Sequence, residues 1–219
     1  MMPAPLLIAA GVVGVVAAVG MTRAVMAAVT GRRPLAILGG ASVGKSNLVR
    51  YLRQREFGPL EENEPPGRFS VTTSKGPIKF AVSSDLRGDD GPTYAVWKKH
   101  FLASEYVWYF FRADLVAQGN AVEVDRVKMH VDMFKGWMIK RGKPKADPKI
   151  ILIGTWADAH PDYQSDPAAV ARAVDSENAV KLGLLKLPDA RLVVGSLRTE
   201  RDAGQLTKRI EESLALQIV

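Results

Sequence analysis

Apolar residues of this chain are grouped into short continuous runs, and amphipathic segments separate these runs. The runs lie at residues 35–38, 106–111, 150–154 and 191–194. Each is rich in branched or aromatic side chains, which predicts a strand buried on both faces. The segments between them carry apolar residues at helical spacing, most clearly Val127, Val131, Phe134 and Met138. Strands that alternate with helices predict an α/β fold with a mostly parallel central sheet.

Two further runs differ from these because they flank a turn. Residues 68–73 and 78–84 lie on either side of Ser74-Lys75-Gly76-Pro77. Gly and Pro at such a junction are typical of a tight turn, so the pair predicts a β-hairpin. Helices are expected from about residue 46, over 93–102, and over 205–217.

The first thirty residues follow a different pattern. No charged side chain occurs from Met1 to Thr22, and residues 5–19 are almost entirely Leu, Ile, Val, Ala and Gly. This length is enough to cross a bilayer core. Arg23, Arg32 and Arg33 follow the apolar stretch, which predicts that the remainder is cytoplasmic. A cleavable signal peptide and a buried helix of a soluble protein remain alternatives.

We therefore expect a single-pass transmembrane anchor at residues 1–30 and one folded domain at 31–219. The chain has 219 residues, no cysteine and a formal net charge of +7. The missing cysteines exclude a disulfide framework and thiolate metal sites. The basic residues gather at the junction after the apolar segment and in the loop at 140–145. They are not interleaved with aromatic residues, as a nucleic-acid-binding surface would require. A membrane surface is favoured as the partner of the junction, and the loop cluster is explained as a solvated turn.

The first apolar run leads directly into a glycine-rich motif of the form GxxxxGK[ST]. Glycines allow successive backbone N–H groups to surround a phosphate, and a helix behind the loop points its positive end at the anion. The lysine would contact the β- and γ-phosphates, and the serine hydroxyl would bind Mg²⁺. The phosphate-binding residues predicted here are Gly39, Gly40, Ala41, Ser42, Val43, Gly44, Lys45 and Ser46.

Three more motifs follow in order, each close to the end of a predicted strand. They are Asp85-Leu86-Arg87-Gly88, Thr155-Trp156-Ala157-Asp158 and Ser196. Together with the phosphate loop, they resemble the DxxG, NKxD and SAK-type motifs of Ras-like small GTPases across residues 34–219. The resemblance implies a P-loop NTPase three-layer sandwich. A GTPase domain behind one N-terminal anchor is similar in layout to the beta subunit of the signal-recognition-particle receptor.

The resemblance also implies roles for individual residues. Asp85 would contact Mg²⁺ through water, and the Gly88 amide would sense the γ-phosphate. Thr155, Trp156, Asp158 and Ser196 would form the guanine site. The Asp158 carboxylate would pair with the base edge, and the Trp156 indole would either stack on the base in place of the family's lysine or serve only in packing.

Two positions depart from the family pattern. Asp89 stands where a glutamine commonly orients the attacking water, so we expect slow hydrolysis with Asp89 as the catalytic residue. The threonine expected as a further Mg²⁺ ligand has no clear counterpart. Thr73 is nearest to the expected place, but it lies closer to Asp85 than the family spacing allows, and an ordinary hairpin position remains the alternative.

The sequence thus predicts a membrane-anchored protein that binds GTP or GDP with Mg²⁺ and hydrolyses GTP slowly. The loops at residues 56–73 and 85–93 would rearrange with the γ-phosphate and recruit a protein partner. Two alternatives remain. One is a nucleotide-binding scaffold subunit of a membrane complex with negligible turnover, and the other is an ATP-using P-loop enzyme.

Overall fold

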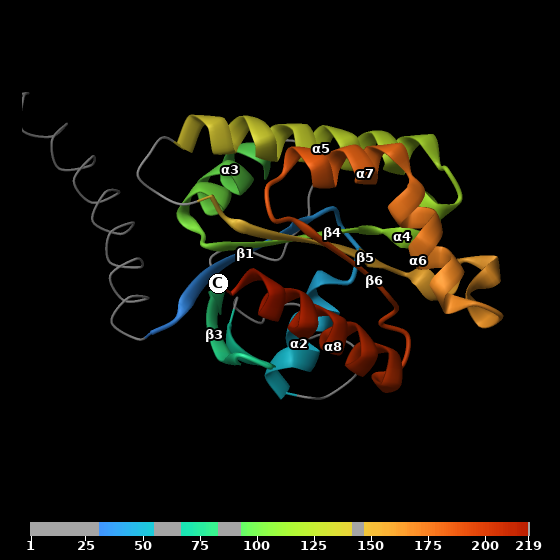
Figure 1. Ribbon diagram of the computed structural model, residues 1–219, viewed down its shortest axis with the longest axis horizontal. Coiled ribbons are helices and arrows are strands. Elements are labelled where there is room, and N and C mark those ends of the chain that lie inside the picture. Colours follow the sequence, from blue (N-terminus) through green and yellow to red (C-terminus); the bar gives the residue numbers. More distant parts are fainter. Residues whose placement is uncertain (1–30, 55–66, 83–92, 142–146, 219) are drawn as a thin grey trace, which may run out of the picture.

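A computed structural model of the chain describes residues 31–54, 67–82, 93–141 and 147–218. Its centre is a six-stranded sheet with the strand order β2-β3-β1-β4-β5-β6 (Figure 1). Only β2 and β3 are antiparallel neighbours, and the other four pairs are parallel. The strands are β1 (Arg33–Gly39), β2 (Arg68–Thr73), β3 (Gly76–Val82), β4 (Tyr106–Arg112), β5 (Lys149–Thr155) and β6 (Arg191–Val194).

The central strands owe their position to continuous apolar sequence. Six of the seven residues of β4 are buried, and so are the last six of β5. Such strands find no solvent on either face, which requires helices on both sides of the sheet. In the hairpin, by contrast, exposed and buried residues alternate along β2, since its outer face meets water.

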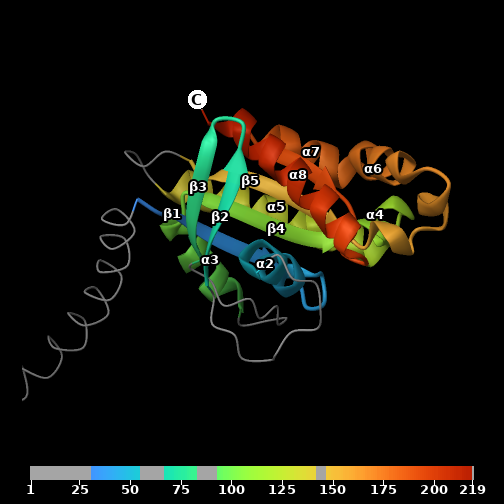
Figure 2. The ribbon, with the colours of Figure 1, turned by 90° about the horizontal axis from the view of Figure 1, so that it is seen from below.

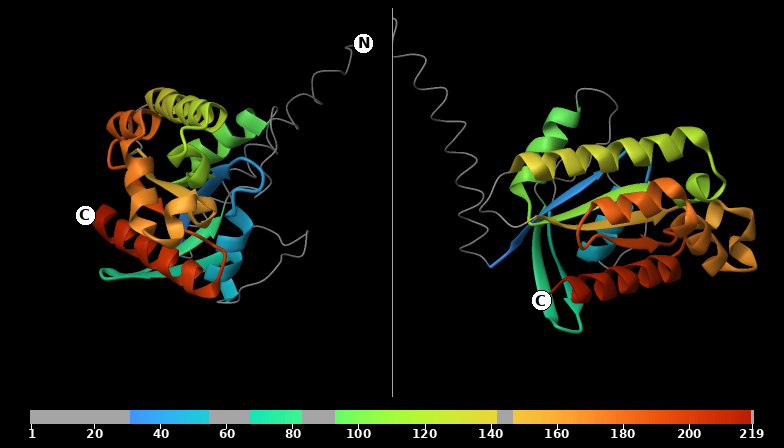
Figure 3. Two further views of the ribbon diagram at one scale, coloured as in Figure 1. Left: turned by 90° about the vertical axis from the view of Figure 1, so that its right-hand side faces the viewer. Right: turned by 45° about the horizontal axis from the view of Figure 1, so that its top comes forward.

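Helices cover both faces of the sheet and give the domain three layers (Figures 1 and 3). On one face lie α3, α5 and α7, and on the other lie α2 and α8. The helices are α2 (Lys45–Gln54), α3 (Thr93–Ala103), α4 (Ala113–Ala117), α5 (Ala121–Arg141), α6 (Pro167–Ser176), α7 (Asn178–Lys186) and α8 (Glu200–Gln217). Two short 3₁₀ helices, η1 (Ala157–Ala159) and η2 (Pro161–Gln164), follow β5.

Each face of the sheet has its own apolar core. The core under α3, α5, α6 and α7 includes Phe101, Tyr109 and Phe134, and it is largely aromatic near its centre. The core under α2 and α8 includes Trp108 and Phe80, whose rings meet edge to face at 5.6 Å. The side chains of alternate residues of β4 therefore pack into opposite cores, because successive side chains of a strand point to opposite faces of the sheet.

The structure confirms the mixed α/β class, the mostly parallel sheet and the predicted hairpin. It adds α4 and resolves the segment after β5 into η1, η2, α6 and α7, which the apolar pattern did not distinguish. Among the described residues, no helix is long and apolar enough to span a membrane. The anchor expected at residues 1–30 lies outside them.

Candidate functional site

The three predicted motifs that lie within the described residues meet at one edge of the sheet. Because β1, β4, β5 and β6 run parallel, their carboxyl ends share an edge. Figure 2 shows β1 and β4 side by side in the sheet. The phosphate loop follows β1, Trp156 follows β5, and Ser196 comes two residues after β6. This edge is where open parallel sheets usually bind ligands.

The phosphate loop contains backbone conformations with positive φ angles, which glycine adopts readily. Gly39 and Gly44 adopt positive φ angles of 139° and 83°. A Cβ atom on Gly39 would lie 2.5 Å from the carbonyl oxygen of Phe110 on the adjacent strand, so only glycine fits at this position. Ser42 also has a positive φ of 57°, which is uncommon for a residue with a side chain. The loop therefore turns sharply at several points before α2 begins.

Lys45 is the first residue of α2, and its side chain folds back over the loop. Its Nζ donates to the carbonyl oxygen of Gly39 at 2.9 Å and also to that of Gly40. The side chain is only 5% exposed. The ammonium group is thus fixed beside the N-terminus of a helix, where the amides of the first turn add positive potential. Ser46 follows in the first turn and is partly buried.

Thr155 connects the end of β5 to the phosphate loop. Its Oγ1 donates to the carbonyl oxygen of Val43 at 2.7 Å and lies 3.3 Å from that of Phe111. The residue is fully buried. The structure therefore gives Thr155 a supporting role for the loop, and its hydroxyl is directed to backbone rather than outward to a base.

Trp156 makes a second connection to the same loop. Its indole Nε1 donates to the carbonyl oxygen of Ser42 at 3.0 Å. The backbone is left-handed, with φ of 59° and ψ of 25°, and the residue is 40% exposed. A bulky residue in this conformation is strained, and such strain is found most often where function requires a fixed side chain.

Asp158 and Ser196, which come from two different motifs, lie in contact. Ser196 Oγ donates to Asp158 Oδ1 at 2.5 Å, and the same hydroxyl accepts the backbone N–H of Arg198 at 3.0 Å. The second bond fixes the serine oxygen, and the serine in turn orients one oxygen of the carboxylate. The other carboxylate oxygen, Oδ2, takes no part in that bond.

Thr73 is placed away from this edge. It ends β2 and pairs with Gly76 at the hairpin turn, where its Oγ1 donates to the Gly76 carbonyl oxygen at 2.8 Å. Because β3 runs parallel to β1, the start of β3 lies at the edge opposite the phosphate loop. The prediction that Thr73 binds Mg²⁺ with Ser46 is therefore wrong, and the ordinary hairpin position is the correct alternative.

Three predicted residues, Asp85, Gly88 and Asp89, lie outside the described residues. The segment that contains them begins directly after β3, whose last residue, Val82, pairs with Leu35 of β1. Among the described residues, no group of three or more His, Asp or Glu side chains could hold a metal ion. Of the predicted Mg²⁺ ligands, only Ser46 is described at the phosphate loop.

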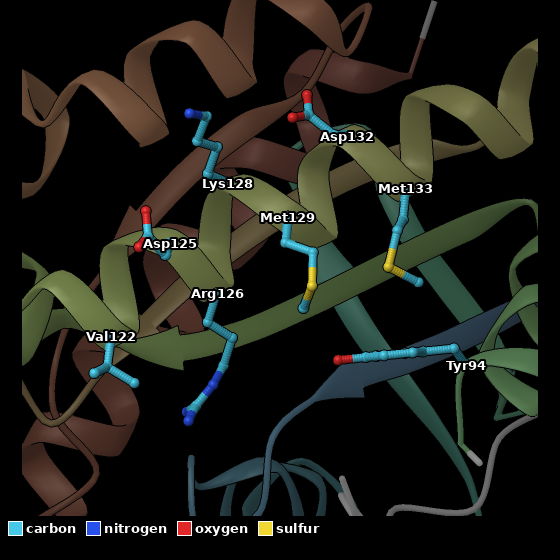
Figure 4. Close-up of a pocket in the computed structure, with 8 residues that line it drawn as sticks. All are labelled: Tyr94, Val122, Asp125, Arg126, Lys128, Met129, Asp132 and Met133. Atoms are coloured by element: carbon cyan, nitrogen blue, oxygen red, sulfur yellow. The ribbon is translucent and has the colours of Figure 1, made fainter. Parts of the chain in front are cut away.

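Sequence reasoning missed a chain of charged residues beside the loop. Glu123 on α5 is buried, accepts the backbone N–H of Arg112 at 3.0 Å, and pairs with Arg126 Nη1 at 2.7 Å. A Cβ on Gly40 would lie 3.8 Å from that same Arg126 nitrogen. Figure 4 shows Arg126 extending from α5 toward the segment that follows β1, at the rim of a surface pocket shared with Tyr94.

Arg112, at the end of β4, is the second missed residue. Its Nε and Nη2 donate to the two carboxylate oxygens of Asp114 at 2.8 and 2.6 Å. These bonds are the main reason why the pKa of Arg112 is raised above its ordinary value, and the Asp158 carboxylate adds a smaller contribution. The one available signal in the sequence was its position directly after the apolar run at 106–111, because ligand-binding residues gather at the carboxyl ends of buried parallel strands.

Comparison with known proteins identifies no family for this chain. No protein-family model matches the chain, and no curated protein matches it. The functional conclusion consequently depends on the residues themselves.

Proposed function

We propose that the chain is a membrane-anchored GTP-binding protein that acts as a slowly hydrolysing GTPase switch and recruits a protein partner. The observation that carries the proposal is the junction of two half-sites. Thr155 and Trp156 donate hydrogen bonds to Val43 and Ser42 of the phosphate loop. The loop with the charged Lys45 is thereby joined to the segment that presents Asp158.

The phosphate half-site suits a nucleoside triphosphate with Mg²⁺. Lys45 supplies a cation inside the loop, and the N-terminus of α2 supplies backbone N–H groups. Ser46 would ligate Mg²⁺ through its hydroxyl. Mg²⁺ needs few protein ligands of this kind because it keeps several waters and binds the phosphates directly. Bound Mg²⁺ would offset the charge of the β- and γ-phosphates.

The base half-site favours guanine over adenine. The Asp158 carboxylate can accept hydrogen bonds only, and guanine offers two adjacent donors, N1–H and the exocyclic amine. Adenine has no donor at N1 and cannot form the same pair. Ser196 supports this preference because it holds one carboxylate oxygen in a fixed position.

The switch and the slow turnover are inferred from sequence around the site. β3 runs toward the edge that carries the glycine-rich loop, and residues 85–93, which come after β3 in the sequence, contain Gly88, which would sense the γ-phosphate, and Asp89, which replaces the usual glutamine. A carboxylate near the γ-phosphate would repel it, so hydrolysis is expected to be slow. The apolar segment at residues 5–22 would hold the domain at the cytoplasmic face of a membrane.

The full chain, purified in detergent, tests this function directly. Bound nucleotide would be released by acid and identified by chromatography, and single-turnover hydrolysis of GTP and ATP would then be followed with and without Mg²⁺. We expect bound GDP or GTP and slow Mg²⁺-dependent release of phosphate from GTP. Equal use of ATP would overturn the guanine assignment. Bound GTP without turnover would support the scaffold alternative instead of the switch.

A further inference from the structure

The guanidinium group of Arg112 is held in one orientation. It forms two parallel hydrogen bonds with Asp114, whose side chain is buried. Paired bonds of this kind fix the plane of the group as well as its position. The backbone of Arg112 is also fixed, because Glu123 accepts its N–H and because it pairs with Thr155 in the sheet.

The fixed guanidinium lies over the indole of Trp156. Its Cζ atom is 4.6 Å from the ring centroid, within the range of a cation–π contact. The Trp156 ring is therefore held in two ways: by a cation on one face, and by the hydrogen bond from Nε1 to Ser42 at its edge. Rotation of the ring would break both contacts.

Despite these contacts, Trp156 remains open to solvent. It is 40% exposed, whereas Trp97, Trp108 and Trp137 are 5%, 0% and 9% exposed. A large aromatic side chain that is rigid and exposed gains little from burial, so packing alone does not account for it. Trp156 also lies between Ser42 in the phosphate loop and Asp158, which it precedes by two residues.

We propose that Arg112 is a positioning residue for purine binding. It covers one face of the Trp156 indole, so that the other face forms a rigid stacking platform for the base of the bound nucleotide. This inference rests on the proposed function and assigns the base contact to a stack of guanidinium, indole and purine. The stack is preformed, so little side-chain entropy is lost when the base binds.

Intrinsic fluorescence gives the first test. The full chain in detergent is titrated with GTP and Mg²⁺ while tryptophan emission is recorded. Stacking of a base on the single exposed tryptophan should change its emission, and Trp156→Phe, titrated at GTP concentrations that saturate the variant as measured by calorimetry, should abolish that change. An emission change that persists in Trp156→Phe would overturn the platform.

Competition between GTP and inorganic triphosphate gives the second test, because triphosphate carries no base. Arg112→Ala should weaken GTP binding by about tenfold, within the range measured for base–aromatic stacking, and leave triphosphate binding unchanged. A purely structural role would weaken both ligands together. Arg172→Ala is the matched control, since Arg172 also pairs with an aspartate, Asp166 at 2.6 Å, but on the exposed surface of α6.

Two further variants keep the test decisive if Arg112→Ala does not fold. Trp156→Ala should weaken GTP binding more than triphosphate binding, because it removes the stacking face as well as the hydrogen bond to Ser42. Arg112→Lys, which keeps the charge but cannot form the planar fork, should give an intermediate loss of GTP binding. Failure of this inference is distinguishable from failure of the proposed function. If the natural chain binds GTP and these variants bind it equally well, only the stack is wrong. If the natural chain binds no GTP, the proposed function fails first.

Discussion

Replacement of Lys45 by alanine tests the phosphate loop most directly. Its ammonium group contacts two carbonyl oxygens at the end of β1, so it lies inside the loop where the β- and γ-phosphates would bind. Two unit charges about 4 Å apart interact by about 4 kcal/mol at the effective dielectric near a protein surface. Loss of that attraction corresponds to about a thousandfold weaker binding of GTP.

The fold should tolerate this change. The carbonyl oxygens of Gly39 and Gly40 lose a donor, but Gly40 is only partly buried and water can reach it. We expect the free energy of unfolding to fall by less than about 2 kcal/mol. Alanine is also a strong helix former, which suits the first position of α2.

The assay is isothermal titration of the full chain with GTP and Mg²⁺, together with thermal unfolding followed by circular dichroism. Lys181→Ala is the matched control, because Lys181 lies on the exposed surface of α7 and carries the same charge. The control should bind GTP as the natural chain does. Lys45→Ala that retains affinity within threefold would refute the assignment of the phosphate loop.

Three other predictions address the base, the loop glycine and the anchor. Asp158→Asn should weaken GTP binding by about tenfold or more and favour xanthosine triphosphate in competition binding. The reason is that Ser196 can donate to the amide oxygen, which leaves the amide N–H donors to face the base. An unchanged preference for GTP would contradict this. Gly39→Ala should lower the free energy of unfolding, measured by denaturant titration, by about 2–5 kcal/mol, because the new Cβ strains the backbone and clashes with β4. The control is Gly136→Ala on α5, where a Cβ meets no atom within 4 Å, and it should be neutral or slightly stabilising. The full chain should remain with membranes through a carbonate wash, and a chain that starts near Arg32 should be soluble and still bind nucleotide. Full-length protein that is soluble without detergent would refute the prediction of an anchor.

Sequence patterns were sufficient to predict the strands of the sheet, because burial on one face gives an alternating pattern and burial on both faces gives a continuous apolar run. The apolar run at 106–111 and the alternation at 68–73 each appear as strands within a residue of the expected ends. The short helix α4 was not predictable in this way, since its five residues are fewer than two turns and show no period. Helix period also could not separate α6 from α7, which meet at Glu177.

The site was predictable only where chemistry is coded by neighbouring residues. Motif order singled out the glycine-rich loop, Asp158 and Ser196, and the structure adds the hydrogen bond between Ser196 and Asp158. The position of Thr73 depended on which edge of the sheet the hairpin turn occupies, and spacing alone did not reveal it. No local sequence pattern predicts the contact of Arg112 with Trp156 or that of Glu123 with Arg126, because both depend on how β4, β5 and α5 pack.

If the chain binds nucleotide and is anchored as proposed, the polarity of the sheet sets the distance between the nucleotide edge and the membrane. The chain enters β1 at Arg33, at the edge where the β2–β3 turn contacts the end of α8 through Lys75 and Ile218. The phosphate loop begins six residues later, at Gly39, at the opposite edge. At about 3.3 Å per residue, the strand alone separates the two edges by roughly 20 Å. If residues 5–22 are anchored as proposed, the nucleotide edge faces away from the bilayer, and a partner recruited there would approach from the cytoplasm without competing with lipid for space.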